Sequence, residues 1–541
     1  MEYAELHAHT NFSLLDGTSD PEVMVDTAAA LGLRALAITD HDSVSGIVRF
    51  AAAAKKYEHF KAIIGVELTL EADAHITLLA KDFTGYEHLC QLLTRAYERG
   101  GKDRPHVTFD ELAAHAKGLI ALSGCPDGEL PRALANPGEA RRIAARYRDA
   151  FEPENYYVEL GNHLLQADRP RNAALRAIAK ALKVGCVATN DVHYHDTDRA
   201  LLHHVVTCIR RGTTLAGAGT LLRGNDEYFL KSAAQMARLF RAEIAQAAEE
   251  GCPELNPIRS TLEIAERCAF SLKDLHYEFP QPYVPSGESA FSFLVRLVEA
   301  GKAIFYPNPS ALVEQRLAHE LEIVQQMNLA GYLLVFKEVV DWSHEQGILC
   351  SIRGSAPASA LLYCLGLCPI DPLEHNLLFE RFCSPERNEY PDIDLDFAHE
   401  RREEVIQHTY EKYGRGCAAM VCEVNTYRAK SALRDVAKVL GLSPQRAQQL
   451  ADQVDWYDPD PAARVIAPRT RATSEVPHRD RPAGLLPVGR GGHPRDQTRA
   501  STLGAVTPPS AVPPGAAHDP RVTGRLGEVL VQLTQQLQNN P

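Results

Sequence analysis

The sequence has 541 residues, of which 45% are hydrophobic and 23% are charged, and its formal net charge is −13. This length exceeds one ordinary hydrophobic core, so we expect two to four domains. There is no run of about 18 apolar residues that could cross a bilayer, and the acidic start lacks the basic and then apolar order of a secretory signal. The twelve cysteines include no Cys-x-x-Cys pair, which indicates reduced thiols. We expect a cytoplasmic protein with no membrane segment; the acidic balance disfavours a wholly basic nucleic-acid coat but allows a locally basic channel.

The first 195 residues alternate short apolar runs with helical patterns. The apolar runs lie at 35–39, 62–67, 75–80, 119–123, 156–160 and 185–189, and helical spacing appears near 86–98, 138–150 and 170–183. This alternation predicts an α/β fold with a parallel sheet, either open or closed into a barrel. Residues 230–280 have a helical pattern, and the proline-rich segment 279–285 is typical of a linker.

A second domain is predicted from about residue 286 to 455, with long helices, a Gly-Ser turn near 354 and one acidic strand near 392. After Trp456 the composition changes to one rich in arginine and proline and free of lysine. We predict that residues 457–521 are disordered, because they cannot bury enough apolar surface to offset chain entropy. The composition also favours translation of a wrong frame over this stretch. Leucines at helical spacing return within 522–541 and predict a short helix.

Residues that commonly bind metals occur near the ends of the predicted strands. His7 and His9 are spaced i and i+2, so on a strand they would point to one face and could share a metal, although two exposed strand histidines are the alternative. The carboxyl ends of strands are where α/β proteins build their sites. We interpret the set as a hydrolytic site in which two or three divalent ions would activate water and bind phosphate. Its further members are Asp16, His41, Glu67, His75, Cys125, Asp191 and His193.

These segments resemble the PHP (polymerase and histidinol phosphatase) domain, a distorted (β/α) barrel with a trinuclear metal site. The resemblance implies that the nine residues just named are metal ligands, with Zn²⁺ or Mn²⁺ bound. It also implies phosphoesterase or proofreading exonuclease activity, with a purely structural metal site as the alternative.

A second group of acidic residues lies on the strand predicted near 392. Asp392, Asp394 and Asp396 alternate with apolar side chains, so a strand would present all three carboxylates on one face. Three close carboxylates repel one another unless cations neutralise them, so we expect Mg²⁺ there. Two such ions would stabilise the attacking and leaving oxygens of a phosphoryl transfer. The alternative is an acidic, solvent-facing edge strand.

Two further motifs are candidates for phosphate binding. Arg353, Gly354 and Ser355 precede an apolar helical pattern at 358–367, where small residues would let backbone N–H groups approach a phosphate. An ordinary turn is the alternative. Lys430 and Arg434 lie one helical turn apart and are candidates for contacting a DNA backbone, or they belong to a solvated helix face.

Together, the motifs at 353–356, 378–382, 385–387 and 391–397 resemble the palm of the bacterial C-family DNA polymerases, the alpha subunits of DNA polymerase III and their error-prone relatives. Segments 399–405 and 426–435 resemble the error-prone branch most. The resemblance covers residues 1 to about 455 and implies a PHP domain at 1–280, the first part of an α+β palm at 286–425 and the start of a helical thumb at 426–456. It implies that Asp392 and Asp394 are catalytic metal ligands, that Asp396 is a companion carboxylate, and that Gly354 and Ser355 bind the nucleotide triphosphate.

The resemblance implies a DNA-directed DNA polymerase that adds dNTPs to a primer on template DNA, in replication and damage-associated synthesis. In the full-length family, the sliding clamp and other replisome or translesion proteins are partners. The family's third palm aspartate, its fingers, its clamp-binding segment and its OB domain have no counterpart here. Ile352 stands where the family usually has glycine, and Pro357 falls just inside the helix. We therefore expect that the chain as it stands cannot extend a primer. The alternatives are a PHP phosphoesterase or 3′–5′ exonuclease acting through the N-terminal domain alone, and a non-catalytic DNA-binding remnant.

Overall fold

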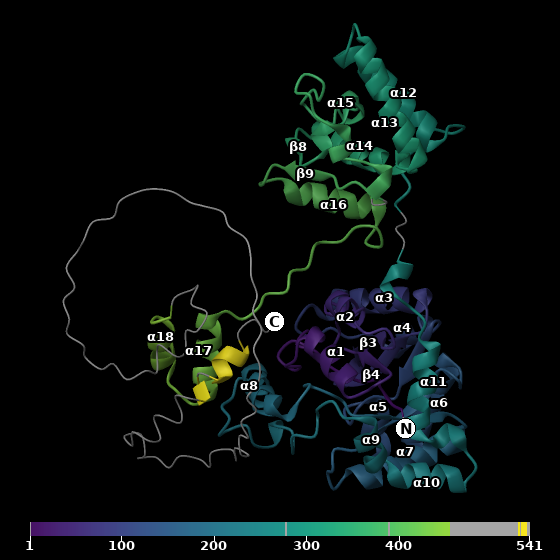
Figure 1. Cartoon of the computed structure of the whole chain (residues 1–541), viewed down its shortest axis with the longest axis vertical. Helices are drawn as coiled ribbons and strands as arrows, with labels where there is room; N and C mark the ends of the chain where they lie inside the picture. Colours follow the sequence, from purple (N-terminus) through teal and green to yellow (C-terminus); the bar gives the residue numbers. More distant parts are fainter. Residues whose placement is uncertain (1, 276–278, 388–389, 455–528, 531, 538–541) are drawn as a thin grey trace, which may run out of the picture. The chain divides into compact units, whose positions relative to one another are not determined.

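The computed structural model describes residues 2–275, 279–387, 390–454, 529–530 and 532–537. The chain divides into two compact units (Figure 1). The first holds the described residues up to Leu275 together with those from Val424 onward, and the second lies within residues 276–423. The segment 457–521, for which disorder or a wrong frame is predicted, falls outside the described residues.

The first unit is built on a seven-stranded sheet whose strands neighbour one another in chain order. A bridge between Ala8 and Val192 joins its first and last edges, so the sheet is nearly closed into a barrel. The six apolar runs of the sequence all fall on strands of this sheet. The strands are β1 Ala4–Glu5, β2 Ala35–Ile38, β3 Lys61–Leu70, β4 Ala74–Ala80, β5 Leu119–Leu122, β6 Tyr156–Gly161 and β7 Gly185–Thr189.

The expectation of an all-parallel sheet is wrong for one strand. β4 runs antiparallel to both β3 and β5, whereas the other neighbouring pairs are parallel. Only the short turn Glu71–Asp73 separates β3 from β4. A parallel crossover needs roughly a dozen residues or more, so this connection can make only a hairpin.

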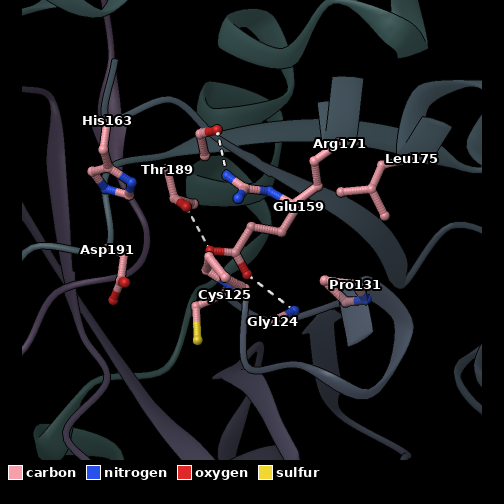
Figure 2. Close-up of a pocket in the computed structure, with 11 residues that line it drawn as sticks. Gly124, Cys125, Pro131, Glu159, His163, Arg171, Leu175, Thr189 and Asp191 are labelled. Carbon is pink, nitrogen blue, oxygen red and sulfur yellow. Dashed lines mark hydrogen bonds between the residues drawn. The ribbon is translucent and has the colours of Figure 1, made fainter. Parts of the chain in front are cut away.

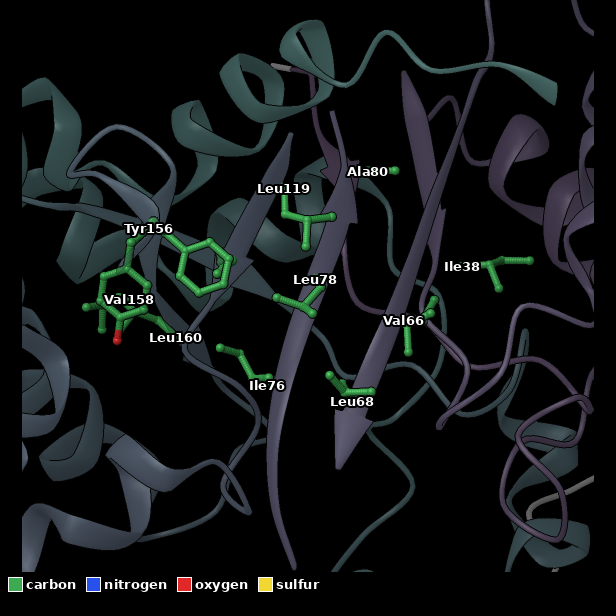
Figure 3. Close-up of a cluster of buried hydrophobic side chains, with 14 of the residues drawn as sticks. Ile38, Val66, Leu68, Ile76, Leu78, Ala80, Leu119, Tyr156, Val158 and Leu160 are labelled. Atoms are coloured by element: carbon green, nitrogen blue, oxygen red, sulfur yellow. The ribbon is translucent and has the colours of Figure 1, made fainter. Parts of the chain in front are cut away.

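Helices surround the barrel, and each strand alternates between two apolar clusters. Val66, Leu78 and Val158 belong to the cluster that packs against the surrounding helices (Figure 3). Residues of opposite parity, such as Ile63 and Leu79, pack on the other face of the sheet together with α11. The helices are α1 Pro21–Ala30, α2 Ile47–Ala54, α3 Phe83–Gly100, α4 Phe109–Ala114, α5 Glu129–Arg132, α6 Pro137–Phe151, α7 Asp168–Leu182, α8 Ala200–Arg211, α9 Ala233–Leu239, α10 Arg241–Glu249 and α11 Pro257–Arg267.

The second unit packs its helices around a two-stranded antiparallel sheet. In this sheet β8, Cys350–Arg353, pairs with β9, Asp394–Phe397, and Arg353 lies opposite Asp394. The apolar pattern predicted as one helix over 358–367 forms a shorter helix, α15. Its helices are α12 Ala290–Phe305, α13 Ala311–Gln326, α14 Ala330–Glu345, α15 Ala360–Cys364 and α16 Arg402–Tyr413.

After the second unit, the chain returns to the first. Helices α17, Ala429–Val439, and α18, Pro444–Ala451, join α8 in one apolar cluster, to which Leu433 contributes a fully buried side chain. The Leu215 N–H donates to the Val439 carbonyl at 3.0 Å. Within the predicted terminal helix, the described residues between 529 and 537 are helical and add leucines to the same cluster.

None of the helices in the described part of the chain is long and apolar enough to span a membrane. All twelve cysteines lie within the described residues and are free thiols, most of them buried.

Candidate functional site

On one face of the barrel strands, the side chains are apolar toward one end of the strand and polar toward the other end. On β3, Ile63 is part of the apolar cluster, and four residues further along the buried Glu67 has the same parity. On β4, Leu79 and His75 show the same change in reverse order. Because β4 is antiparallel, its first residues lie at the edge where its neighbours end. This orientation explains how His75, at the start of a strand, pairs with side chains at the ends of others.

The structure brings all nine predicted metal-ligating residues together. They form four groups, and within each group the candidate ligand atoms lie within 4.8 Å of one another. One histidine outside the predicted set, His203, completes the third group. The groups are His7, His9 and Asp191; His9, His41 and Glu67; Asp16, His193 and His203; and Glu67, His75 and Cys125.

Glu67 is the central carboxylate of the set and is only 1% exposed. Its Oε2 lies 2.9 Å from His41 Nδ1 and 3.5 Å from His9 Nε2, and its Oε1 lies 3.4 Å from His75 Nδ1. Asp191 occupies a similar position on the other side, with its Oδ1 at 3.2 Å from His193 Nε2 and 3.6 Å from His9 Nε2. Each carboxylate therefore faces imidazoles that come from different segments of the chain.

Several of these atoms are buried without a hydrogen-bond partner. They include Nε2 of both His7 and His9, Nδ1 of His193 and Oε1 of Glu67. Buried polar atoms in proteins are rarely left unpaired. Imidazole nitrogens and carboxylate oxygens are ligands that divalent transition ions accept. The residues present therefore fit a multinuclear metal centre.

The histidines of the set differ in their charge near neutral pH. Burial lowers the pKa of His9 and His193 to about 4, so both rings are neutral at pH 7. Burial alone would raise the pKa of Glu67, but the neighbouring His41 holds it well below its usual range, so the carboxylate stays ionised. The pKa of His7 is raised against the effect of burial, because Glu159 and Glu67 favour its charged form. A metal ion would have to displace that proton.

Glu159 is a residue of the site that the sequence analysis missed. Its carboxylate accepts a hydrogen bond from His7 Nδ1 at 2.6 Å. It also accepts one from the Gly124 N–H at 3.1 Å and one from the Thr189 hydroxyl, both of which are drawn in Figure 2. Together these bonds fix the ring of His7 with its Nε2 turned toward Glu67. An acid inside the apolar run 156–160 was the available sequence signal, because a charge buried in a strand requires partners.

Two arginines flank the centre and were also missed. Arg223 lies 3.3 Å from Asp191 Oδ2, hydrogen-bonds His193 Nε2 and stacks on the ring of Tyr228. Arg210 lies 3.1 Å from Asp16 Oδ1. The side chains of Arg223 and Arg210 are 27% and 37% exposed, so both are partly accessible to solvent. Guanidinium groups in this position can contact a phosphate, although loop and helix arginines carry no distinctive sequence signal.

The three predicted aspartates lie at the two-stranded sheet of the second unit. Asp392 is exposed just before β9, Asp394 is half-buried at its start, and Asp396 is exposed within it. Ile393 between them is buried in the apolar cluster of the unit, so the side chains alternate between the core and the solvent. Carboxylate oxygens suit Mg²⁺ by their chemistry, but the three aspartates are not among the metal-compatible groups found in the described part of the chain.

Arg353 of β8 lies directly against this acidic strand. Its guanidinium is 3.4 Å from Asp394 Oδ2 and 3.1 Å from Asp396 Oδ1. The next residue, Gly354, has φ of +79°, and a Cβ there would lie 3.1 Å from Asp394 Oδ2. Glycine thus permits both the backbone turn and the close approach to the acid. The predicted phosphate-binding turn and the acidic strand lie side by side and form one exposed surface. Ser355 is half-buried beside it.

The N-terminus of α15 does not offer free N–H groups to a phosphate. The carboxylate of Glu320, on α13, is fully buried and accepts hydrogen bonds from the Ser359 hydroxyl and from the N–H groups of Ala360 and Leu361. The first donors of α15 are therefore satisfied within the chain. The candidate phosphate-binding residues 353–355 precede this helix and are separated from it by the short turn Ala356–Ala358.

Lys430 and Arg434 both lie on α17, in the first unit, and their side chains are half-buried. The buried face of this helix is the one that packs with α8, and it consists of alanines, Leu433 and valines. Within the described residues, no ion pair is found for either basic side chain. Lys438 on the same helix, by contrast, pairs with Asp435.

Two family models match the chain, and the second continues past residue 423 into the segment that returns to the first unit. The PHP domain family matches residues 5–163, and the family described as bacterial DNA polymerase III alpha NTPase domain matches residues 292–479, beyond Trp456. An error-prone DNA polymerase of Mycobacterium tuberculosis is 40% identical over 471 residues, covering 84% of this chain and 42% of that protein. One from Pseudomonas aeruginosa is 38% identical over 466 residues, covering 86% and 43%.

A solved structure of an amidohydrolase from Chromobacterium violaceum matches with 17% identity and a TM-score of 0.28, covering 36% of this chain and 88% of that one. At this score the likeness supports no conclusion about the chain.

The barrel with its cluster of ligands, followed by the matched alpha region, defines a PHP-containing protein of the polymerase III alpha class. The chain belongs to the bacterial C-family DNA polymerases, and the curated relatives named above are error-prone members of that family. It spans 42% of the length of the mycobacterial relative and 43% of the pseudomonad one.

Proposed function

We propose that the chain serves template-directed DNA synthesis of the error-prone type, in which a nucleotidyltransferase adds dNTPs to a primer 3′ end, and that by itself it binds metal and nucleotide without extending a primer. The observation that carries the proposal is the acidic strand, where Asp394 lies in register with Arg353 and the Arg353 guanidinium contacts both Asp394 and Asp396. A phosphoesterase that used only its barrel would have no need for this arrangement. The names of the relatives point the same way.

In this proposal Asp392 and Asp394 bind Mg²⁺, and Asp396 is a companion carboxylate. Divalent ions held there would stabilise the charges of a phosphoryl transfer. Arg353, Gly354 and Ser355 contact the triphosphate of the incoming nucleotide, for which Arg353 exchanges its bonds to the aspartates. Because Arg353 is 61% exposed, a phosphate can reach it without rearrangement of the core.

The proposed macromolecular partner is primer–template DNA, with Lys430 and Arg434 as phosphate contacts on the helical thumb segment 426–456. The sliding clamp and other replisome or translesion proteins are proposed partners of the full-length relatives. A role on bacterial chromosomal DNA places the protein in the cytoplasm.

The test is isothermal titration calorimetry of the full chain with a dNTP in Mg²⁺, followed by primer extension, for which we expect no product from the chain alone. Asp394→Asn should weaken dNTP binding by about tenfold or more, because it removes a charged ligand of the ion. The matched control is Asp341→Asn, on α14 of the same unit, whose carboxylate pairs locally with Lys337. Equal dNTP binding by wild type and Asp394→Asn would contradict the proposal.

A second candidate function is metal-dependent hydrolysis of phosphoesters at the barrel, including 3′–5′ removal of nucleotides. It is favoured by the unpaired, buried nitrogen and oxygen atoms that face one another across the metal-ligand set. Zn²⁺ or Mn²⁺ would lower the pKa of bound water. The chain's own contribution would be to orient His7 through Glu159 and to bind a substrate phosphate with Arg223 and Arg210.

This candidate is tested with purified chain and Mn²⁺ or Zn²⁺ on 3′-ended DNA and on small phosphomonoesters. We expect His9→Ala to abolish product formation. His59 is exposed, so His59→Ala should form product at the wild-type rate. Product that persists in His9→Ala would contradict the assignment. Product lost in Asp392→Ala would assign the activity to the acidic strand instead.

A further inference from the structure

His203 lies outside the ligand set predicted from the sequence, yet its side chain is buried at the metal centre. It sits on α8 and is only 2% exposed. Its ring centroid is 5.1 Å from that of His193 and 5.7 Å from that of Tyr194. The helix therefore holds an imidazole beside the residues that follow β7.

Neither ring nitrogen of His203 has a hydrogen-bond partner, although both are buried. The carboxylate oxygen Asp16 Oδ1 lies 3.6 Å from Nε2, which is too long for a hydrogen bond. A histidine that served only as packing would not need a carboxylate opposite its ring. The Asp16 carboxylate and the His203 ring thus face each other with no hydrogen bond between them.

The gap has the length that a shared ion requires. Two ligand atoms that each lie about 2.1 Å from a tetrahedral ion are about 3.4 Å apart. Asp16 repeats this spacing on its other oxygen, because Oδ2 lies 3.6 Å from the unpartnered Nδ1 of His193. We propose that His203 is a further metal ligand of the centre and that it holds a divalent ion together with Asp16 and His193.

Other charged groups around Asp16 are compatible with this role. His41 Nε2 lies 3.0 Å from Oδ2, and Arg210, also on α8, lies 3.1 Å from Oδ1. The side chain of Arg210 is 37% exposed, so the guanidinium has solvent as an alternative partner when an ion binds. His204, the next residue, is half-buried and belongs to none of the metal-compatible groups found among the described residues.

The inference rests on metal binding at the barrel, as proposed for phosphoester hydrolysis, and it is tested without measuring activity. The full chain is stripped with a chelator and loaded with Co²⁺, and the bound ions are counted by equilibrium dialysis and followed by visible absorption. Cys125 supplies an internal marker, because a thiolate ligand gives a charge-transfer band. We expect His203→Ala to lose about one ion per chain, or to bind it 10- to 100-fold more weakly, with the Cys125 band intact.

The matched control, His204→Ala, should keep the wild-type count and spectrum. His203→Cys should add a second thiolate-to-cobalt band, and this gain decides the matter even if circular dichroism finds His203→Ala unfolded. Wild-type count, affinity and ligand-field spectrum in His203→Ala, or no added band in His203→Cys, would overturn the inference. A wild-type chain that binds no Co²⁺ would overturn both the inference and the metal centre, whereas failure of the His203 variants alone would leave the centre standing.

Discussion

Glu159 shows how a residue that need not touch a metal can fix one that does. Its carboxylate holds His7 Nδ1 at 2.6 Å and is itself held by the Gly124 N–H and the Thr189 hydroxyl. Such partners orient the imidazole and increase its basicity as a ligand. The tautomer with the proton on Nδ1 leaves the lone pair on Nε2, the nitrogen that faces Glu67 and Asp191.

We predict that Glu159→Gln weakens Zn²⁺ binding about 10- to 100-fold, because the amide is a poorer acceptor and no longer favours this tautomer. Competition with a chromophoric chelator measures the change. Glu154→Gln, at an exposed position just before the same strand, is the matched control. If Glu159→Gln kept wild-type affinity, the orienting role would be wrong.

A second residue-scale prediction concerns pH and the ion pair at the start of α4. The hydrogen bond from Arg99 lowers the pKa of Glu111 to about 2, and Glu111 also completes a capping box with Thr108. A carboxyl whose folded pKa lies below its unfolded value stabilises the fold above the unfolded pKa, and this contribution is lost as pH falls through the folded pKa. The window therefore runs from about pH 5 down to about 2.

We expect Glu111→Gln to lower the melting temperature slightly at pH 7 and the difference from wild type to shrink as pH falls from 5 toward 2. The effect is small because solvent screens this partly exposed pair. Thermal melts at several pH values test it, with the exposed neighbour Asp110→Asn as control. A difference that stayed constant across this range would argue against the ion pair.

At the scale of elements, the sheet formed by β8 and β9 joins a cation to the acids that we propose bind metal. Arg353 contacts both Asp394 and Asp396, so it neutralises charge where Mg²⁺ would bind. The two kinds of cation must compete for the same oxygens. A phosphate that draws Arg353 away would thereby favour the metal.

We predict that Arg353→Gln raises the affinity of the nucleotide-free chain for Mn²⁺ severalfold and weakens dNTP binding, because the same cation opposes metal and attracts triphosphate. Electron paramagnetic resonance of free Mn²⁺ and calorimetry measure the two effects. Arg401→Gln, whose guanidinium pairs locally with Glu404, is the control. Unchanged Mn²⁺ binding would mean that the arginine does not compete.

Features that depend on interactions between residues close in sequence could be predicted, whereas features that depend on distant segments could not. Apolar alternation located the strands, since their side-chain period is local. The antiparallel direction of β4 is explained by the shortness of the turn that precedes it. The predicted strands, 62–67 and 75–80, were shorter than the real ones, so the sequence did not reveal how short this turn is. His203, Glu159 and Arg223 escaped notice because their roles depend on contacts with segments distant in sequence. The carboxylate of Glu320, which lies on another helix, likewise accepts hydrogen bonds from the first N–H groups of α15.

At the scale of the whole molecule, α8 serves two neighbours. His203 lies at the metal centre, while Leu202, Val205 and Val206 belong to the apolar cluster shared with α17. The order of the centre and the attachment of the returning segment thus depend on the same helix. The buried side chains at this contact are those of alanine, valine, leucine and the cysteine Cys208.

We predict that Leu433→Ala destabilises this attachment by about 2–5 kcal/mol, the usual cost of emptying a buried leucine site. Hydrogen exchange of the α17 and α8 amides should become faster, while exchange in the barrel strands stays close to wild type. The exposed Lys438→Ala is the control. Protection of α17 that survived Leu433→Ala would show that the cluster does not hold the helix.

The return of the chain to the barrel has a consequence for biosynthesis. Residues 276–423 are translated between the barrel and the helix that packs on α8. At about 5–20 residues per second, the ribosome takes roughly 7–30 s to make them. During that interval the apolar side of α8 has no α17 to cover it. A nascent barrel therefore emerges with an uncovered hydrophobic stripe, which makes it a natural client for a chaperone at the exit tunnel.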